Sequence, residues 1–193
     1  MKINLTIGIP VWLDIICAWP LMVYRRRKYG YDFRRIYLGE GEWTILDQQD
    51  YYRLGNFKWW LKGFKTKCYA FRTSKLGPMK TRFVSLHREI MNPPKGLVVD
   101  HRNGDGLDNR RANLRLATHS QNMINRPKTK SKTTSKFVGV NFDKSRNKWA
   151  AKIHYENKKI WLGRFDSEID AAKAYDEAAI KYHGEFARLN FTP

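Results

Sequence analysis

Cysteine is scarce in this 193-residue chain, which contains only Cys17 and Cys68. Two thiols cannot supply a disulfide framework or a four-cysteine zinc site. The scarcity instead predicts a protein of a reducing, intracellular compartment.

Acidic side chains are also few. The chain has 18 Asp and Glu residues against 37 Lys and Arg residues, which gives a formal net charge of +19. Residues 80–130 alone carry 11 basic and 4 acidic side chains. A surplus of this size predicts a polyanionic partner, with nucleic acid favoured over an acidic membrane surface. The hydrophobic content of 42% is too high for a disordered basic tail.

The one long apolar run covers residues 7–24 and is followed by four cations at 25–28. Asp14 lies near its middle and would cost about 2.5–3.5 kcal/mol in a bilayer. Pro10 and Pro20 are expected to interrupt a helix at both ends of the run. A membrane role is therefore not expected. Residues 1–34 are predicted to be an apolar and basic extension whose role stays open between packing, dimerisation and an interfacial anchor.

Residues 35–91 are predicted to be rich in β-structure, because short aromatic runs alternate with glycine. The expected strands are 36–38 and 43–46 around a turn at 39–41, then 57–60 and 68–71, and finally 81–86, with a short helix over 47–54.

The sequence between residues 87 and 122 carries the candidate chemistry. A short apolar strand ends at Asp100 and His101, and a loop rich in Asn, Gly and Asp follows. A helical segment is expected to open over residues 111–116. Phosphodiester hydrolysis needs an activated water and a cation on the phosphate. Imidazole titrates near neutral pH, so His101 is the natural base.

Oxygen donors for a cation lie on both sides of this loop. Asp100 supplies a hard carboxylate ligand suited to Mg²⁺, and Asn122 can add a neutral one. Asn113 can hold the loop, because its amide both accepts and donates hydrogen bonds to backbone groups. Adjacent strand residues point to opposite faces, so the strand must end or distort if Asp100 and His101 serve one site.

This arrangement resembles the HNH endonucleases, the ββα-metal group, and specifically the H-N-N subtype of phage and bacterial homing endonucleases. The resemblance implies a hairpin and a helix around one divalent cation, Mg²⁺ or another ion such as Mn²⁺. It makes His101 the general base and Asn113 the structural asparagine, and it places Asp100 and Asn122 at the metal positions. The absence of CxxC pairs excludes the zinc-knuckle versions.

Further basic residues accompany the motif. His87 fits the pattern of the subtype and joins the catalytic set, and Arg88 is a candidate phosphate contact. We expect the DNA backbone to be contacted by Arg110, Arg111 and Arg115. The alternative is that these arginines only face solvent on a helix surface.

A basic stretch over residues 126–136 is predicted to be an exposed linker. After it, the sequence takes on the alternating pattern of β-strands. Strands are predicted over 137–142, 148–155 and 159–165, with one basic and one apolar face. A helix over 167–183, capped by Ser167 and ended by Gly184, should cover the apolar face. Its apolar residues at helical spacing are Ile169, Ala172, Ala179 and Ile180.

This segment resembles the plant ethylene-response-factor (APETALA-two) DNA-binding domain through the runs FVGV, KWAAKI, WLGRFDS, AAKAYDEAA and GEFARLNF. The resemblance implies a sheet that enters the major groove. Val138, Asn141 and Asp143 stand where plant members carry guanine-reading arginines, so the plant site preference should not transfer. The positions that match DNA contacts of the family are Lys148, Lys152, His154, Lys159, Trp161 and Tyr175.

Together these features predict an α+β protein, with a ββα-metal core followed by a three-stranded antiparallel sheet packed on one helix. The expected parts are an N-terminal extension (1–34), an HNH nuclease domain (35–125), a basic linker (126–136) and an APETALA-two-like domain (137–193). The expected partner is double-stranded DNA, with no small-molecule cofactor.

The predicted function is homing-type DNA cleavage by hydrolysis of phosphodiester bonds, in a cytoplasmic, nucleoid-associated protein of a bacterium or phage. Nicking is the default for one active site per chain, since a double-strand break would need a homodimer or two visits. The alternative is a sequence-specific DNA-binding regulator with an inactive nuclease core. An RNA-directed nuclease is a third reading, which the sheet disfavours because the deep, narrow major groove of A-form RNA would not admit it.

Overall fold

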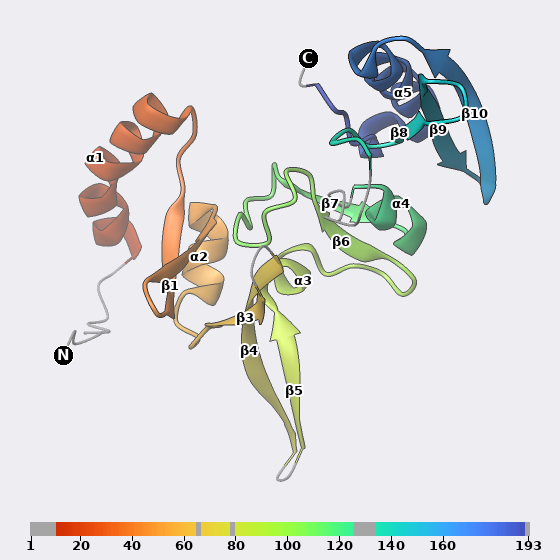
Figure 1. The fold of residues 1–193 in the computed structure, drawn as a ribbon. Helices are drawn as coiled ribbons and strands as arrows, with labels where there is room; N and C mark the ends of the chain where they lie inside the picture. The colour runs from red at the N-terminus through yellow and green to blue at the C-terminus, as the bar shows by residue number, and fades with distance from the viewer. Residues whose placement is uncertain (1–10, 65–66, 78–79, 126–133, 192–193) are drawn as a thin grey trace. The chain divides into compact units, whose positions relative to one another are not determined.

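The computed structural model describes residues 11–64, 67–77, 80–125 and 134–191 (Figure 1). Most of the predicted basic linker therefore lies outside the described residues. The chain divides into two compact units, residues 1–116 and 117–193. Helices and strands mix in both, which confirms the predicted α+β class.

The N-terminal helix α1 (Val11–Tyr29) runs through Pro20, so the prediction that this proline interrupts a helix is wrong. Pro20 cannot donate to the carbonyl of Ile16, but both residues are exposed and water can take up that carbonyl. Asp14 on α1 accepts hydrogen bonds from Arg34 (3.2 Å) and from the Tyr52 hydroxyl (2.7 Å). The acidic residue that disfavours membrane insertion thus fastens α1 to the rest of its unit.

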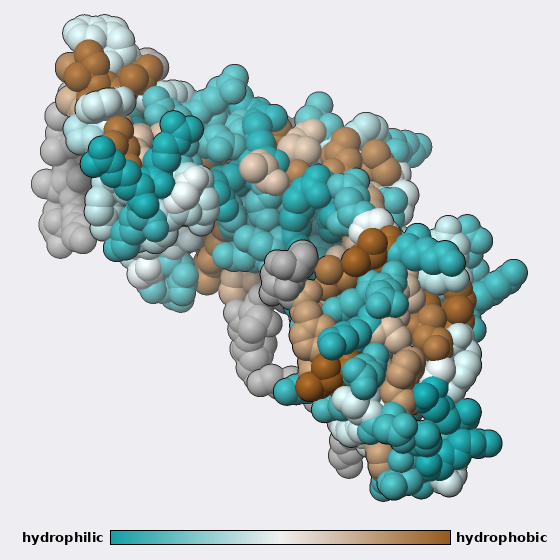
Figure 2. Space-filling model, turned by 90° about the horizontal axis from the view of Figure 1, so that it is seen from above, coloured by the Kyte–Doolittle hydropathy of each residue, from teal (hydrophilic) through white to brown (hydrophobic). Residues whose placement is uncertain are grey.

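Much of the apolar surface of α1 is exposed. Figure 2 shows hydrophobic side chains gathered over this helix. Trp12, Ile16 and Trp19 are among its exposed residues. None of the helices in the described part of the chain combines the length and the apolar character that a membrane crossing requires.

Three small sheets build the first unit. Strands β1 (Arg34–Gly39) and β2 (Glu42–Leu46) form an antiparallel hairpin, as the glycine turn predicts. The second sheet has the order β3-β4-β5, and the third joins β6 to β7. Their bounds, with the helices between them, are α2 (Gln48–Leu54), β3 (Trp60–Phe64), β4 (Lys67–Gly77), β5 (Lys80–Ser85), α3 (Leu86–Met91), β6 (Val98–His101) and β7 (Leu114–Ala117).

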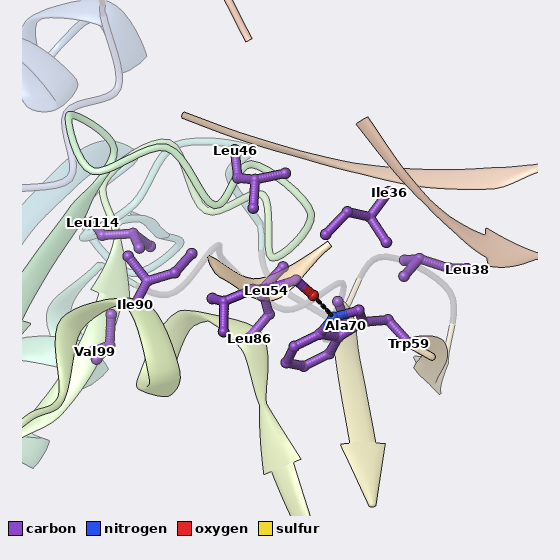
Figure 3. Close-up of a cluster of buried hydrophobic side chains, with 10 residues drawn as sticks. All are labelled: Ile36, Leu38, Leu46, Leu54, Trp59, Ala70, Leu86, Ile90, Val99 and Leu114. Carbon is purple, nitrogen blue, oxygen red and sulfur yellow. Dashed lines mark hydrogen bonds between the residues drawn. The ribbon is translucent and has the colours of Figure 1, made fainter. Parts of the chain in front are cut away.

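The strand predicted over 57–60 lies later, over Trp60–Phe64. Trp59 is buried, and its indole Nε1 donates a hydrogen bond to the carbonyl of Leu54 at the end of α2 (2.9 Å; Figure 3). The Trp59 side chain therefore binds the C-terminal end of α2, and the residues before β3 do not pair in the sheet.

One hydrophobic core joins these elements (Figure 3). Its members come from the first hairpin, from α2 and α3, and from the strands that carry the nuclease motif, so the motif is built onto the earlier part of the chain. The buried residues are Ile36, Leu38, Leu46, Leu54, Trp59, Ala70, Leu86, Ile90, Val99 and Leu114.

The helix expected to open over residues 111–116 is not formed. Residues 111–113 make a turn, and β7 then pairs with β6. The helix of the motif is α4 (His119–Ile124), where Thr118 and Gln121 form a capping box. The order β6, β7, α4 is the ββα order of the prediction.

In the second unit, β8 (Val140–Asp143), β9 (Lys148–Tyr155) and β10 (Lys158–Phe165) form an antiparallel sheet in the order β10-β9-β8. Helix α5 (Glu168–His183) begins at the Ser167 cap and packs against this sheet, and a short 3-10 turn (Gly184–Phe186) follows it (Figure 1). The predicted three-stranded sheet on one helix is confirmed.

The packing of α5 differs in detail from the prediction. Ile169 and Ile180 are exposed, and the buried face is made by small residues and Tyr175 instead. Gly139 makes this close approach feasible: its φ is +75°, and a Cβ there would lie 2.0 Å from the Tyr175 ring. The buried helix residues are Ala171, Ala172, Tyr175, Asp176, Ala178 and Ala179.

Candidate nuclease site and DNA-binding face

Asp100 and His101 lie at the end of β6, and both side chains are buried. They contact different neighbours. Asp100 is bound by Arg115 of β7, whereas His101 contacts Asn109 of the following loop and two aromatic rings. This division fits the alternation of side chains along a strand.

The structure brings the two predicted catalytic histidines together. The ring centroids of His87 and His101 are 5.2 Å apart, and the ring of Tyr69 lies 5.5 Å from the first and 5.8 Å from the second. His87 Nε2 is 3.2 Å from the Ser85 hydroxyl. His87 Nδ1 is buried and has no hydrogen-bond partner among the described residues.

Burial keeps both rings neutral near pH 7. It lowers the pKa of His87 to about 3, with added repulsion from His101 and Arg88. Burial also lowers the pKa of His101, although the hydrogen bond to Asn109 and the nearby carboxylates of Asp100, Asp105 and Asp108 oppose the shift. A neutral imidazole is the form that can accept a proton.

Arg115 is held inside the protein. Its Nε and its terminal nitrogen lie 2.8 and 2.7 Å from Asp100 Oδ2, and the Arg115 side chain is 6% exposed. The prediction that Arg115 faces the DNA backbone is therefore corrected. As the second residue of β7, it lies beside β6 and neutralises the buried carboxylate.

Arg110 and Arg111 also bind carboxylates of their own unit. Arg110 makes a two-pronged contact with Asp108 (2.7 and 2.6 Å) and lies over the ring of Tyr31. Arg111 makes a similar contact with the buried Asp50 (2.7 and 2.9 Å). These contacts stabilise the loop, and DNA contact by either arginine stays a prediction. Arg88 is exposed on α3 and also stays a candidate phosphate contact.

Asn113 makes the two backbone hydrogen bonds expected of a residue that holds the loop. Its Oδ1 accepts from the amide of Asn103 (3.0 Å), and its Nδ2 donates to the carbonyl of Asp108 (2.8 Å). The loop also joins the edge of β2 by a parallel bridge between Ile45 and Asp108. The backbone around His101 is thus fixed from both sides.

The predicted metal ligands are one carboxylate and one amide. Asp100 lies in the first unit, and Asn122 lies partly exposed on α4 in the second. The described residues contain no group of three or more His, Cys, Asp or Glu side chains that could hold a metal. Two hard oxygen donors still suit Mg²⁺, which keeps several waters and needs few protein ligands. The pairing of Asp100 with Asn122 stays a prediction.

In the second unit, a basic and aromatic face forms on β9 and β10. Lys152 lies opposite Trp161, and His154 lies opposite Lys159 in the strand register. Trp161 is 50% exposed, so it does not serve the core. Burial and the nearby charge of Lys159 lower the pKa of Lys152.

Two other predicted DNA contacts lie elsewhere in this unit. Lys148 forms an ion pair with Asp166 (3.0 Å). Tyr175 is 7% exposed and packs in the core with Ile153 and Ala179. The structure therefore gives Tyr175 a packing role, and a DNA-backbone contact by this residue stays a prediction.

Sequence reasoning missed Tyr69, Asn109 and Thr44. Asn109 lies in a loop whose asparagines read as turn residues. Thr44 is 65 residues earlier in the chain, and nothing in its local sequence marks it as part of a site. Only the folded hairpin brings Thr44 to the loop that follows His101.

Comparison with known proteins finds two domain families in this chain. A family model described as "HNH endonuclease" matches residues 91–124, and a model described as "AP2 domain" matches residues 135–185. The chain therefore combines an HNH endonuclease domain with a C-terminal AP2 domain, as the resemblances predicted.

Two plant proteins are among the similar curated proteins. APETALA2-like protein 2 of Oryza sativa subsp. indica is 45% identical over 62 residues, which are 31% of this chain and 14% of that protein. Ethylene-responsive transcription factor ERN3 of Medicago truncatula is 46% identical over 63 residues, 32% of this chain and 26% of that protein. The chain thus spans about a quarter or less of these relatives. No solved structure gave a significant match.

Proposed function

We propose that this chain is a metal-dependent DNA endonuclease of the homing type, in which the AP2 domain supplies most of the target recognition. The observation that carries the proposal is the closeness of two imidazoles, His87 and His101, whose ring centroids are 5.2 Å apart and whose pKa values are lowered by burial. His101 lies within the residues that match the HNH endonuclease model. A neutral imidazole supplies the proton acceptor that phosphodiester hydrolysis needs.

In the proposed reaction, His101 accepts a proton from the water that attacks the phosphorus atom. Asp100 and Asn122 would hold a divalent cation, which neutralises charge on the phosphate and on the leaving oxygen when bound. Asn113 keeps the His101 loop in place, and His87, whose ring lies against His101, is the second histidine of the proposed catalytic set.

The test is conversion of a supercoiled plasmid to nicked or linear DNA, with Mg²⁺ and with EDTA. We expect cleavage only when the metal is present, because Asp100 and Asn122 alone cannot neutralise the reacting phosphate. The ratio of nicked to linear product reports single-strand or double-strand cutting. DNA binding without cleavage in both Mg²⁺ and Mn²⁺ would favour the alternative of a regulator with an inactive core.

The exposed face of β9 and β10 is proposed to bind duplex DNA. Replacing Lys152 and Lys159 by alanine should weaken binding and make log K less steeply dependent on log salt. The slope should fall by about 0.9 for each phosphate that these lysines neutralise. The measurement is a fluorescence-anisotropy titration at several salt concentrations.

The matched control for the sheet variant is Lys173→Ala with Lys181→Ala. Both lysines are exposed on α5, which packs against the sheet, and their removal changes the net charge equally. An equal weakening in the two double variants would show a general charge effect and contradict a role for this face. Duplex RNA that competes as well as duplex DNA would contradict a DNA-specific face.

A further inference from the structure

We infer that Asn109 is a positioning residue that fixes the tautomer of His101, with the proton on Nε2 and the lone pair on Nδ1. The inference about the tautomer rests on hydrogen bonds alone, and only its catalytic consequence rests on the proposed function. That consequence is that His101 accepts the proton of the attacking water at Nδ1.

The orientation of the Asn109 amide follows from its partners. The hydroxyl of Thr44 is 2.7 Å from the carbonyl of Leu107, which can only accept, so the hydroxyl proton is used in that bond. Thr44 Oγ1 must then accept from Asn109, whose Nδ2 is 2.7 Å away. The same Nδ2 lies 3.3 Å from the carbonyl of Gly106, another acceptor. Asn109 therefore presents its oxygen on the opposite side.

That oxygen faces the base. Asn109 Oδ1 lies 3.3 Å from His101 Nε2, and a carbonyl oxygen cannot donate, so Nε2 must carry the proton. In a neutral imidazole one nitrogen is protonated and the other has the lone pair. The proton acceptor of the neutral ring is consequently Nδ1.

The amide has little freedom to reverse. Asn109 and Thr44 are both fully buried. The backbone amide of Asn109 donates to the carbonyl of Ile45 (2.8 Å), and the amide of Ile45 donates to the carbonyl of Leu107 (2.9 Å). A reversed amide would set its oxygen against two acceptors, the carbonyl of Gly106 and the Thr44 hydroxyl oxygen, whose proton is already donated to Leu107. Burial makes such a mismatch costly. Thr44 of β2 thus fixes the orientation of the Asn109 amide, and that amide selects the tautomer of His101.

The direct test is the ¹⁵N NMR spectrum of the full chain at neutral pH, with the His101 resonances assigned by comparison with His101→Ala. We expect a protonated Nε2 and an unprotonated Nδ1. A protonated Nδ1 in the wild-type protein would overturn the inference, whatever the activity of the protein.

Two variants extend the test to catalysis. Asn109→Ala should reduce the cleavage rate by about 10–100-fold at saturating DNA, with unchanged DNA affinity, because an orienting partner of the base is removed. Asn109→Asp keeps an acceptor for Nε2 and should recover the Nε2-protonated form and most of the rate. If Asn109→Ala keeps the wild-type tautomer, Asn109 does not select it and the inference fails.

The two hypotheses fail separately. A wild-type protein with a protonated Nε2 that cuts no DNA retains the tautomer and loses the proposed function. A wild-type protein that cuts DNA with a protonated Nδ1 retains the function and overturns the role of Asn109.

Discussion

A His101→Ala variant should bind duplex DNA with wild-type affinity and cleave it at least about 100-fold more slowly. The imidazole is buried at the end of β6, where burial lowers its pKa and keeps it in the proton-accepting form. Alanine has no group to accept the proton from water. The measurement is the single-turnover rate of plasmid nicking with Mg²⁺, beside a binding titration of the same preparation.

The control for this variant is His119→Ala, which removes an exposed imidazole at the start of α4. We expect it to cleave DNA at the wild-type rate. If His101→Ala cleaves as fast as the wild type, the assignment of the base is wrong, or the activity belongs to a contaminating nuclease. A decrease in binding that equals the decrease in cleavage would show that the imidazole serves DNA binding and not proton transfer.

An Arg115→Ala variant should lower the free energy of unfolding of its unit by about 3–5 kcal/mol. Arg115 and Asp100 are both buried, and they are joined by two contacts of 2.8 and 2.7 Å. Removal of the guanidinium leaves a carboxylate in the interior without its main neutralising partner. Urea titration followed by tryptophan fluorescence measures the change, since Trp59 lies in the core of this unit.

The matched control is Arg82→Ala on β5, where the arginine is exposed. We expect that variant to lie within about 0.5 kcal/mol of the wild type, as surface substitutions usually do. A double variant, Arg115→Leu with Asp100→Asn, should recover part of the stability because it removes both charges from the interior. An Arg115→Ala variant as stable as Arg82→Ala would contradict the importance of the pair.

The local pattern of the sequence was sufficient for many elements. The turn at Gly39, Glu40 and Gly41 predicted the first hairpin, and the alternation along residues 148–155 predicted which side of β9 meets α5. Ser167 and Gly184 correctly marked the ends of α5. These features depend on near neighbours in the chain, which a sequence displays directly.

Errors arose where tertiary contacts decide between two local options. Leu114, Arg115 and Leu116 are good helix formers, but Leu114 enters the shared core and Arg115 meets Asp100, so the segment becomes β7. Ile169 and Ile180 have helical spacing, yet the close packing of α5 on the sheet buries alanines instead.

The sequence predicted the residues of the candidate site, but it did not predict the hydrogen bonds and ion pairs that hold the surrounding loop. Asp100, His101 and Asn113 were identified from one motif. The loop around them is held by Thr44, 65 residues before its partner Asn109, and by Asp50, 61 residues before its partner Arg111. A single sequence contains no signal that joins positions so far apart, because the contacts exist only after the hairpin and the loop have come together.

The docking of the loop on β2 limits how this HNH domain could be transferred to another protein. A segment cut to the recognisable motif, residues 91–124, would lack Thr44, the bridge at Ile45 and the counter-charge of Asp50. It would also lack most of its core, which extends back to Ile36. A chimaera with another DNA-reading module would therefore have to carry the chain from Arg34 onward, so the transferable cassette is much longer than the motif suggests.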